Sequence, residues 1–333
     1  MNIKDYLEKV KSRGVSVVKT IEKILQEAKN SPNHFTAISR SYALEQAGKI
    51  EKNPQGSLAG LPISVKDGIC VKNIESAAGS EILKDYRPPF SATAVNKLEK
   101  EGAIIIGKTS QDEFGFGGFS VNTKKIPKNP YDLTRSCGGS SGGAAGFTAF
   151  TTQPHIALGE STGGSIANPA SFCGVVGLTP TYGLVSRYGL IDYANSLDKI
   201  GAIAKTVSDS FLGLYHISGY DEKDSTSLPQ KMSKVKKIKK IAVIKESLDV
   251  DKEIKDVVLS RLKDYDLISL PSIKRYSIPA YYLIAMSEAS TNLAKYCGLR
   301  YGQTLPLKGS YNEFFTEVRS KYFSKEAKRR IDR

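Results

Sequence analysis

The chain has 333 residues, which is enough for one large domain or two smaller ones with a substantial buried core. No apolar stretch approaches the roughly 18 residues of a membrane span, and the charged start MNIKDYLEKVKS lacks the apolar region of a signal peptide. The net charge is +14, and the four cysteines show no CxxC or other metal-ligand spacing, so we expect a cytoplasmic protein with reduced thiols and no metal site.

The first part of the chain has helical periodicity. Apolar residues recur at helical spacing over residues 3–29 and about 40–52. We therefore expect residues 1–55 to form an N-terminal helical segment that precedes the main domain.

Beyond residue 55, strands alternate with helices, which indicates an α/β layered fold. The apolar run LPISV predicts a buried strand that ends at Lys66. The later elements are predicted over these ranges: a helix at 92–101, strands at 103–107 and 156–159, a helix at 209–218, a polar loop at 219–227, a strand at 238–244, a helix at 252–262, a strand at 267–270, and helices at 279–296 and 311–330.

One stretch imitates a nucleotide-binding loop. Residues 102–109, GAIIIGKT, fit the pattern G-x-x-x-x-G-K-[ST] of the phosphate-binding P-loop. In a P-loop the first glycine follows the strand, whereas here Ala103 to Ile106 are themselves apolar and strand-like. This arrangement points Lys108 away from any phosphate cradle, so we expect no nucleotide site here.

Two glycine-serine clusters are the most informative feature, GGSSGG at 138–143 and STGGSI at 161–166. Taken alone, the first is typical of a flexible linker, and the second of a strand-to-helix turn capped by Ser161 or Thr162. Both clusters adjoin apolar segments, which a linker would not do. Two serines beside a lysine at a strand end, Lys66, suggest an acyl-transfer enzyme whose base is an amine.

The histidines support this interpretation. The chain has only His34, His155 and His216, and none lies in a recognisable catalytic context. A Ser-His-Asp triad is therefore the weaker hypothesis.

These motifs resemble the amidase signature family, whose pattern is GGSSGG, then GGSI, with a Val-Lys-Asp lysine upstream. The matching residues are 138–143, 163–166 and 65–67. The resemblance implies a mixed β-sheet flanked by helices over residues 56–333. It also implies Ser165 as the nucleophile, Ser140 as a bridging serine after a cis peptide bond, and Lys66 as the base.

Three positions depart from the family pattern. Ala167 stands where most members carry arginine, and Glu160-Ser161 stands where a Ser-Asp pair is more common. The separation of the two serines is 165 − 140 = 25, one residue longer than expected. The first two departures concern the substrate side, and the extra residue is expected in the loop around Phe150 to Pro154. The three relay residues stay in place.

The implied chemistry is physically consistent. Lysine acts as a base only when neutral, so burial must lower its pKa from about 10.4. Lys66 would then take a proton from Ser140, and Ser140 from Ser165. The backbone N–H groups of the second cluster are the expected oxyanion hole; they belong to Thr162, Gly163, Gly164 and Ser165.

Several further segments resemble one branch of the family, the A subunits of tRNA-dependent amidotransferases. They are AGSEIL (78–83), GKTSQDEFGFG (107–117), GLVSRYGLIDYANSLDKIG (183–201), GYDEKDSTS (219–227) and MSEASTNLAKYCGLRYG (286–302). This likeness implies glutamine hydrolysis, with ammonia passed to a B subunit that uses ATP and Mg, and a small C subunit that clamps the pair. It implies no cofactor in this chain, contact with misacylated tRNA mainly through the partner, and no membrane.

The same likeness suggests substrate-binding residues. Ser141 and Tyr301 are the expected contacts of glutamine, with Arg300 or Tyr296 as alternatives to Tyr301. Family members continue beyond the position of Arg333, with an arginine and an aspartate that hold the head group of glutamine. We therefore expect the domain to be C-terminally incomplete, as a fragment, a truncated reading frame or half of a split protein.

Two other functions stay open. The chain could be a stand-alone amidase for another small amide, or a non-catalytic basic scaffold that contacts tRNA. The lysine-rich run at 231–240 fits a solvated basic surface, or proximity to RNA or an acidic partner. No RNA-binding module is visible in the sequence.

Overall fold

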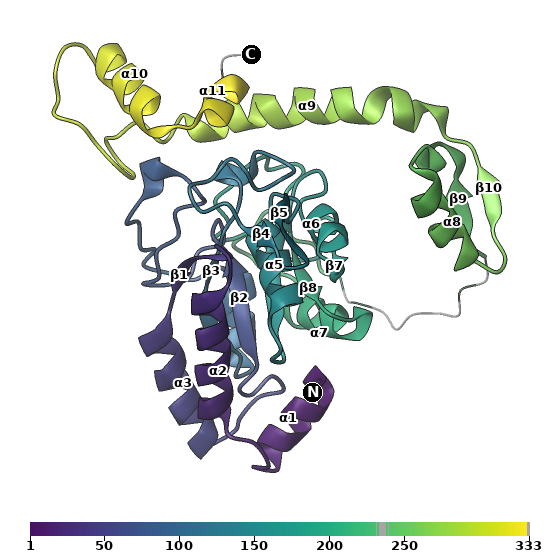
Figure 1. The fold of residues 1–333 in the computed structure, drawn as a ribbon. Coiled ribbons are helices and arrows are strands. Elements are labelled where there is room, and N and C mark those ends of the chain that lie inside the picture. The colour runs from purple at the N-terminus through teal and green to yellow at the C-terminus, as the bar shows by residue number, and fades with distance from the viewer. Residues whose placement is uncertain (231, 233–237, 239, 332–333) are drawn as a thin grey trace.

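Six strands form the central sheet of the computed structural model, which describes residues 1–230, 232, 238 and 240–331 (Figure 1). Across the sheet they lie in the order β1 (Phe35–Ile38), β3 (Ile104–Thr109), β2 (Pro62–Lys66), β6 (Ile156–Ser161), β8 (Lys199–Ala204) and β7 (Val176–Leu178). The three neighbours β3, β2 and β6 run parallel, and the other pairs are antiparallel. This mixed sheet confirms the predicted α/β fold.

Helices cover both faces of the sheet. They are α5 (Gly142–Phe150) and α6 (Ala167–Phe172) on one face, and α4 (Thr93–Lys100) and α7 (Val207–Ile217) on the other. Successive side chains along a strand point to opposite faces of the sheet, so each strand can pack against helices on both faces. Ala157 and Ile203 pack toward α5 and α6, whereas Ile156 and Ala202 pack toward α7. Helix α5 was not predicted, because glycine, which disfavours helix, occupies three of its nine positions.

The N-terminal segment differs from its prediction in two ways. The expected helix at 3–29 is broken into α1 (Ile3–Lys11) and α2 (Val17–Asn30), since Arg13 has a φ of 58° and Ser16 caps the second helix. Strand β1 was not predicted at all; it lies between α2 and α3 (Arg40–Lys52) and pairs with β3. Residues before 56 therefore contribute a strand to the main sheet as well as helices.

A small unit follows the sheet. It consists of β9 (Ala242–Ile244), a 3₁₀ turn η3 (Lys245–Leu248), α8 (Lys252–Ser260) and β10 (Asp266–Ile268), with β9 and β10 parallel. The strand predicted at 238–244 and the basic run at 231–240 lie partly outside the described residues. Figure 1 shows this unit at the far end of the long helix α9, apart from the central sheet.

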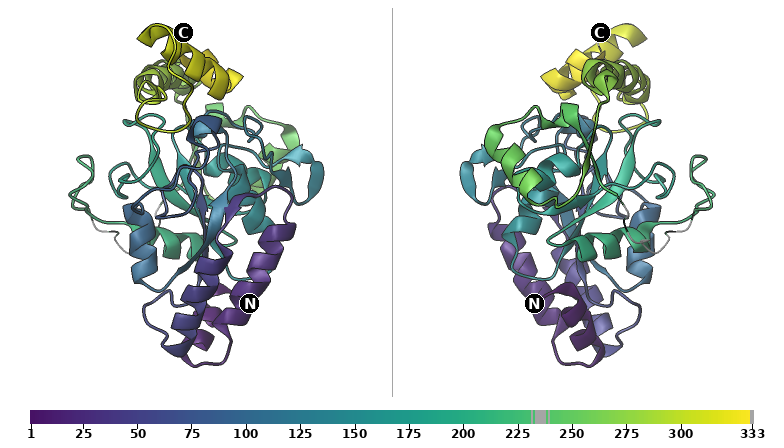
Figure 2. Two further views of the ribbon diagram at one scale, coloured as in Figure 1. Left: turned by 90° about the vertical axis from the view of Figure 1, so that its left-hand side faces the viewer. Right: turned by 90° about the vertical axis from the view of Figure 1, so that its right-hand side faces the viewer.

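The C-terminal helices form a second layer above the sheet edge that carries the glycine-serine clusters (Figure 2). Helix α9 (Pro271–Leu293) begins eight residues before the predicted 279, and the helix predicted at 311–330 is divided into α10 (Tyr311–Tyr322) and α11 (Lys325–Ile331). Phe323 is extended at the division, and the Glu313 and Ser310 capping box starts α10.

Short elements complete the fold. They are the 3₁₀ turns η1 (Glu81–Leu83) and η2 (Glu113–Gly115) and the hairpin of β4 (Lys128–Asn129) with β5 (Asp132–Ser136). Among the described residues, no helix is long and apolar enough to span a membrane.

Candidate active site

The site lies where three parallel strands end. The carboxyl ends of β3, β2 and β6 meet at one edge of the sheet, which is where open α/β folds place their ligands. In the register Val65 pairs with Leu158, so Lys66 at the end of β2 comes beside Glu160 near the end of β6.

Lys66 is fully buried and uses all three of its N–H donors. Its Nζ lies 2.7 Å from Ser140 Oγ, 3.1 Å from the carbonyl oxygen of Glu160 and 2.8 Å from Glu160 Oε2. Lys66, at the end of the predicted buried strand, therefore lies at the centre of a polar cluster.

The GGSSGG loop is held tightly by the segment 110–122. The Gly139–Ser140 peptide bond is cis, as the family resemblance implied. A Cβ at Gly139 would lie 2.4 Å from Asp112 Oδ2 and 2.6 Å from the Ser120 nitrogen, so only glycine fits between these groups. Asp112 in turn accepts backbone hydrogen bonds from Ser120 and Asn122, which keeps its carboxylate partnered.

The second cluster lies against the first. STGGSI forms the turn between β6 and α6, and the backbone N–H of Ser141 donates to the Ser165 carbonyl at 3.2 Å. Asn168 Nδ2 donates to the Gly139 carbonyl at 3.0 Å and links α6 to the same loop. Ser165 is 9% exposed, whereas Ser140 is fully buried, so Ser165 is the more accessible of the two serines.

One of the backbone N–H groups expected in the oxyanion hole already has a hydrogen-bond acceptor within the turn. The N–H of Gly164 already donates to Ser161 Oγ at 3.1 Å, so this group is occupied within the turn. The N–H groups of Thr162, Gly163 and Ser165 are the remaining candidates for stabilising a developing oxyanion.

Both expected substrate-binding residues lie in unexpected surroundings. Ser141 is fully buried, and its hydroxyl donates to the Glu160 carbonyl at 3.1 Å, so its side chain joins the two loops. Tyr301 is 47% exposed and lines a separate cavity of about 220 Å³ together with Tyr296. The tyrosine that packs on the STGGSI turn is Tyr281 of α9, whose ring would lie 2.6 Å from a Cβ on Gly163.

The side chains of Glu160, Thr162 and Asp198 form a cluster that was not predicted; Thr162 was predicted only as a backbone N–H donor, and Glu160 was noted only as a departure from the family pattern. Thr162 Oγ1 lies 2.8 Å from Glu160 Oε1 and 2.7 Å from Asp198 Oδ1. Burial, followed by the nearby Glu160 charge, raises the pKa of Asp198 to about 8. The sequence did contain one signal for the contact between Lys66 and Glu160: each of these charged residues lies at or near the end of an apolar strand, PISVK for Lys66 and IALGES for Glu160.

The remaining sequence candidates are structural. His155 is buried, lies 2.9 Å from Ser64 Oγ, and has a pKa lowered to about 3 chiefly by burial. Lys108 is buried within β3, where its Nζ donates to the carbonyls of Asp67 and Ile69 and to Ser76 Oγ. No phosphate cradle surrounds it in the part of the chain that the structure describes, so the P-loop likeness is only a sequence coincidence.

The described residues contain no group of three or more His, Cys, Asp or Glu side chains that could hold a metal ion. All four cysteines are buried and free.

Comparison with known proteins gives consistent results. A family model described as Amidase matches residues 16–333. The A subunit of glutamyl-tRNA(Gln) amidotransferase from Halothermothrix orenii is 42% identical over 346 residues, covering 99% of this chain and 72% of the relative. The A subunit of the same name from Archaeoglobus fulgidus is 43% identical, covering 99% and 74%.

Solved structures agree with this result. The A subunit of glutamyl-tRNA(Gln) amidotransferase from Thermotoga maritima is 30% identical with a TM-score of 0.72, covering 99% of this chain and 75% of that one. A peptide amidase bound to chymostatin, at 24% identity and a TM-score of 0.84, shares the fold.

Proposed function

The chain belongs to the amidase family, and from this premise we propose that it hydrolyses the side-chain amide of glutamine and supplies ammonia to a tRNA amidotransferase. The two relatives at 42% and 43% identity are both named as the A subunit of such an enzyme. The observation that carries the proposal is the 2.7 Å contact between Lys66 Nζ and Ser140 Oγ, beside the turn that holds Ser165.

The proposed reaction proceeds through an acyl-enzyme. Ser165 Oγ attacks the amide carbon as its proton moves to Ser140, and the proton of Ser140 moves to Lys66. Backbone N–H groups of Thr162 and Gly163 stabilise the oxyanion. The relay then returns a proton to the leaving ammonia, and water hydrolyses the ester by the reverse path. Lys66 is neutral when Ser165 or water attacks, and it is protonated when ammonia or Ser165 leaves.

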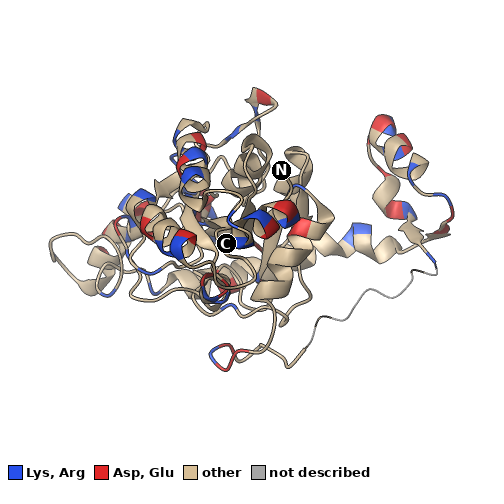
Figure 3. Ribbon diagram, turned by 90° about the horizontal axis from the view of Figure 1, so that it is seen from below, with Lys and Arg blue, Asp and Glu red and all other residues tan. Residues whose placement is uncertain are grey.

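The proposed assembly is a complex of this chain with B and C subunits. Ammonia passes to the B subunit, which activates Glu-tRNA(Gln) or Asp-tRNA(Asn) with ATP and Mg, so this chain itself needs no cofactor. Figure 3 shows Lys and Arg interspersed with Asp and Glu along the helices in this view. In the proposed complex, misacylated tRNA is contacted mainly through the partner.

The nucleophile is tested by covalent labelling. A glutamine analogue with an electrophilic γ-carbon should add one adduct to the intact protein, located at Ser165 by peptide mass spectrometry. Ser165→Ala should abolish the adduct. Ser171→Ala is the matched control, because the exposed Ser171 hydroxyl bonds only to the Asn168 carbonyl nearby.

Ammonia release tests the substrate and the assembly. Glutamine should be hydrolysed faster when the B and C subunits are co-expressed with this chain. Equal rates with and without them, and a preference for another small amide, would favour the stand-alone amidase. An adduct that persists in Ser165→Ala would exclude the proposed nucleophile.

A further inference from the structure

One hydroxyl lies between two buried carboxyl groups. Thr162 Oγ1 is 2.8 Å from Glu160 Oε1 and 2.7 Å from Asp198 Oδ1. A hydroxyl has a single proton to donate, so it can donate to only one of these oxygens. The other contact must be made by a protonated carboxyl that donates to Thr162, since two bare oxygens at this distance repel each other.

The surroundings of the two carboxyl groups differ. Glu160 Oε2 lies 2.8 Å from Lys66 Nζ and accepts a hydrogen bond from it, so Glu160 is ion-paired with a cation. Asp198 accepts backbone N–H bonds from Tyr193 and Ala194 on Oδ2 alone, which leaves Oδ1 facing Thr162. Burial and the charge of Glu160 also raise the pKa of Asp198 to about 8. The proton between the two groups therefore belongs to Asp198.

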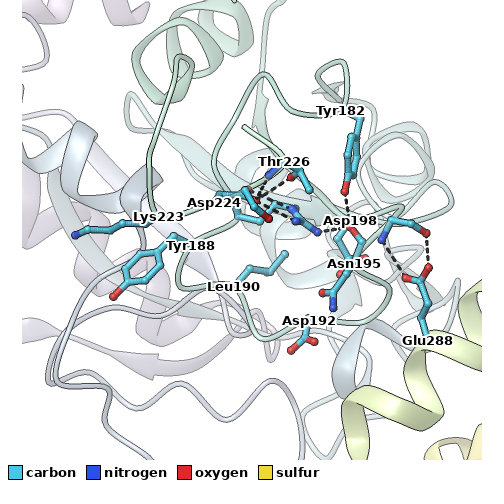
Figure 4. Close-up of a pocket in the computed structure, with 13 residues that line it drawn as sticks. Tyr182, Tyr188, Leu190, Asp192, Asn195, Asp198, Lys223, Asp224, Thr226 and Glu288 are labelled. Atoms are coloured by element: carbon cyan, nitrogen blue, oxygen red, sulfur yellow. Dashed lines mark hydrogen bonds and ion pairs between the residues drawn. The ribbon is translucent and has the colours of Figure 1, made fainter. Parts of the chain in front are cut away.

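Asp198 also lines an open pocket, of whose lining Lys66 is not a part. The pocket has a volume of about 600 Å³ and its lining includes Tyr182, Arg187, Asn195 and Glu288 (Figure 4). Arg187 is paired with Asp224 across this pocket, with Nη2 and Oδ1 3.0 Å apart. The hydrogen-bonded path from Lys66 through Glu160 and Thr162 thus ends at Asp198, which is 1% exposed and belongs to the lining of this pocket.

We infer that Glu160, Thr162 and Asp198 form a proton path that carries the surplus proton of Lys66 to this pocket and so sets the protonation state of the lysine. The inference rests on the proposed role of Lys66 as the base. Glu160 and Asp198 act through Lys66, so they are positioning residues.

The proton balance is simple. In the resting state Lys66 is an ammonium, Glu160 is ionised and Asp198 is protonated. Asp198 loses its proton to a water molecule in the pocket, and the Thr162 hydroxyl turns to donate to the freed Oδ1. Glu160 takes a proton from Lys66 and, after its carboxyl turns, donates it toward Thr162. The result is a neutral Lys66, a protonated Glu160, an ionised Asp198 and one hydrated proton in the pocket.

Other charged and titratable groups surround this path, and none of them is substituted in the variants that the test compares. Those facing Asp198 or Glu160 are Lys199 on β8, Arg187 in the preceding loop and Tyr281 on α9, and Asp112 faces Lys66 from the 110–122 segment.

The test uses a probe that does not depend on glutamine. A small alkyl fluorophosphonate forms an ester with an activated serine and releases fluoride, so its labelling rate at Ser165 against pH reports the state of the base. Asp198→Asn cannot release a proton, so Lys66 must deprotonate beside an ionised Glu160. We expect the midpoint of the rate profile to rise by about one pH unit or more in this variant. Thr162→Val should raise it similarly, and Thr162→Ser, which keeps a hydroxyl, should restore it.

Two further variants sharpen the result. Glu160→Gln removes the carboxylate that favours the ammonium, so its midpoint should move in the opposite direction, to lower pH. Asp192→Asn is the matched control, since Asp192 lines the same pocket but pairs with Lys295. It should leave the midpoint in place.

The outcomes separate the two proposals. Unchanged midpoints in both Asp198→Asn and Thr162→Val, even with lower plateau rates, would overturn the proton path and leave the relay intact. If Asp198→Asn does not fold, Thr162→Val decides alone. Labelling in the wild type without glutaminase activity would reject the proposed substrate only. A wild-type protein that the probe does not label would overturn the base role of Lys66, and the path with it.

Discussion

At the scale of single residues, the positive charge of Lys66 at the end of β2 is paired with the carboxylate of Glu160, which lies 94 positions later in the chain. Lys66 is fully buried, and Glu160 Oε2 lies 2.8 Å from its Nζ, so the two charges are paired away from solvent. Breaking a buried pair by removing one partner is costly because the other charge is left without compensation. The two side chains therefore act as one unit, and substitutions of either change both folding and chemistry.

Lys66→Arg tests the need for a neutral base. Arginine keeps the positive charge but stays protonated at any working pH, so it cannot accept the Ser140 proton. We expect the labelling rate of Ser165 to fall by about 10²-fold or more, because a loss of this size is typical when general-base catalysis is removed.

Unfolding curves serve as the control for Lys66→Arg, since a lost fold would also lower the rate. A folded variant with a rate within a few-fold of the wild type would remove Lys66 from the proposed mechanism.

Lys108→Met tests the second buried lysine. Methionine fills the space but leaves the carbonyls of Asp67 and Ile69 without their donor. Because Lys108 is fully buried and its charge compensates Asp67, we expect a loss of about 3–5 kcal/mol in the free energy of unfolding, measured by urea titration.

Lys100→Met is the matched control, because Lys100 is exposed at the end of α4 and should change stability by less than about 0.5 kcal/mol. Equal stabilities of the two variants would show that the buried contacts of Lys108 contribute little.

At the scale of elements, helix α9 bears directly on the site. Tyr281 packs over Gly163, and Asn292 and Glu288 bond to the loop at 193–196. The glycine in the STGGSI turn therefore permits a close helix contact as well as an exposed backbone N–H. Docking of α9 and the geometry of the turn depend on each other.

A double-mutant cycle measures this coupling. In Gly163→Ala the new Cβ would lie 2.6 Å from the Tyr281 ring, so the helix or the turn must shift. We expect a loss of about 1–3 kcal/mol in stability together with slower labelling of Ser165.

Adding Tyr281→Ala to Gly163→Ala should recover part of both losses, because the smaller side chain leaves room for the methyl group. Strictly additive effects of the two substitutions would show that Tyr281 and Gly163 are not coupled.

At the scale of the whole molecule, two hydrophobic clusters hold the fold together. The larger one fills the space between the sheet and helices α1 to α4 and α7. The second joins α9, α10 and α11 to the loops around Phe114 and Tyr193, next to the site. Arg330 of α11 is 3% exposed and lies over the rings of Phe116 and Tyr193, which adds cation–π contacts to this cluster.

The buried His155 predicts how stability changes with acid. Its pKa in the folded protein is lowered to about 3, whereas in the unfolded chain it is about 6.5, so the unfolded state binds more protons between these values. The contribution of His155 to the free energy of unfolding is therefore complete above about pH 6.5, and it is lost as the pH falls from there toward 3. His155→Gln does not titrate, so between about pH 7 and pH 5 it should lose roughly 2 kcal/mol less than the wild type.

The measurement is urea unfolding at several pH values, compared between the wild type and His155→Gln. Parallel dependence on pH in the two proteins would mean that His155 is not buried in the neutral form.

Several features could be predicted from the sequence because they depend on local patterns. The alternation of strands and helices, the strand that ends at Lys66, and the adjacency of both glycine-serine clusters to core segments follow from periodicity and composition within short windows. For the same reason the apolar residues inside GAIIIGKT excluded a P-loop, and the structure places Lys108 within β3.

Other features were decided only by the tertiary structure. Strand β1 exists because β3 offers it an edge. The helix predicted at 3–29 is divided by the non-helical residues 12–16, and the one predicted at 311–330 by residues 323–324. The pairing of Lys66 with Glu160 depends on the register of β2 against β6, and the packing of Tyr281 on Gly163 joins residues more than 100 positions apart. Such contacts are set by how elements pack in space, and periodicity within one segment carries no information about its partner.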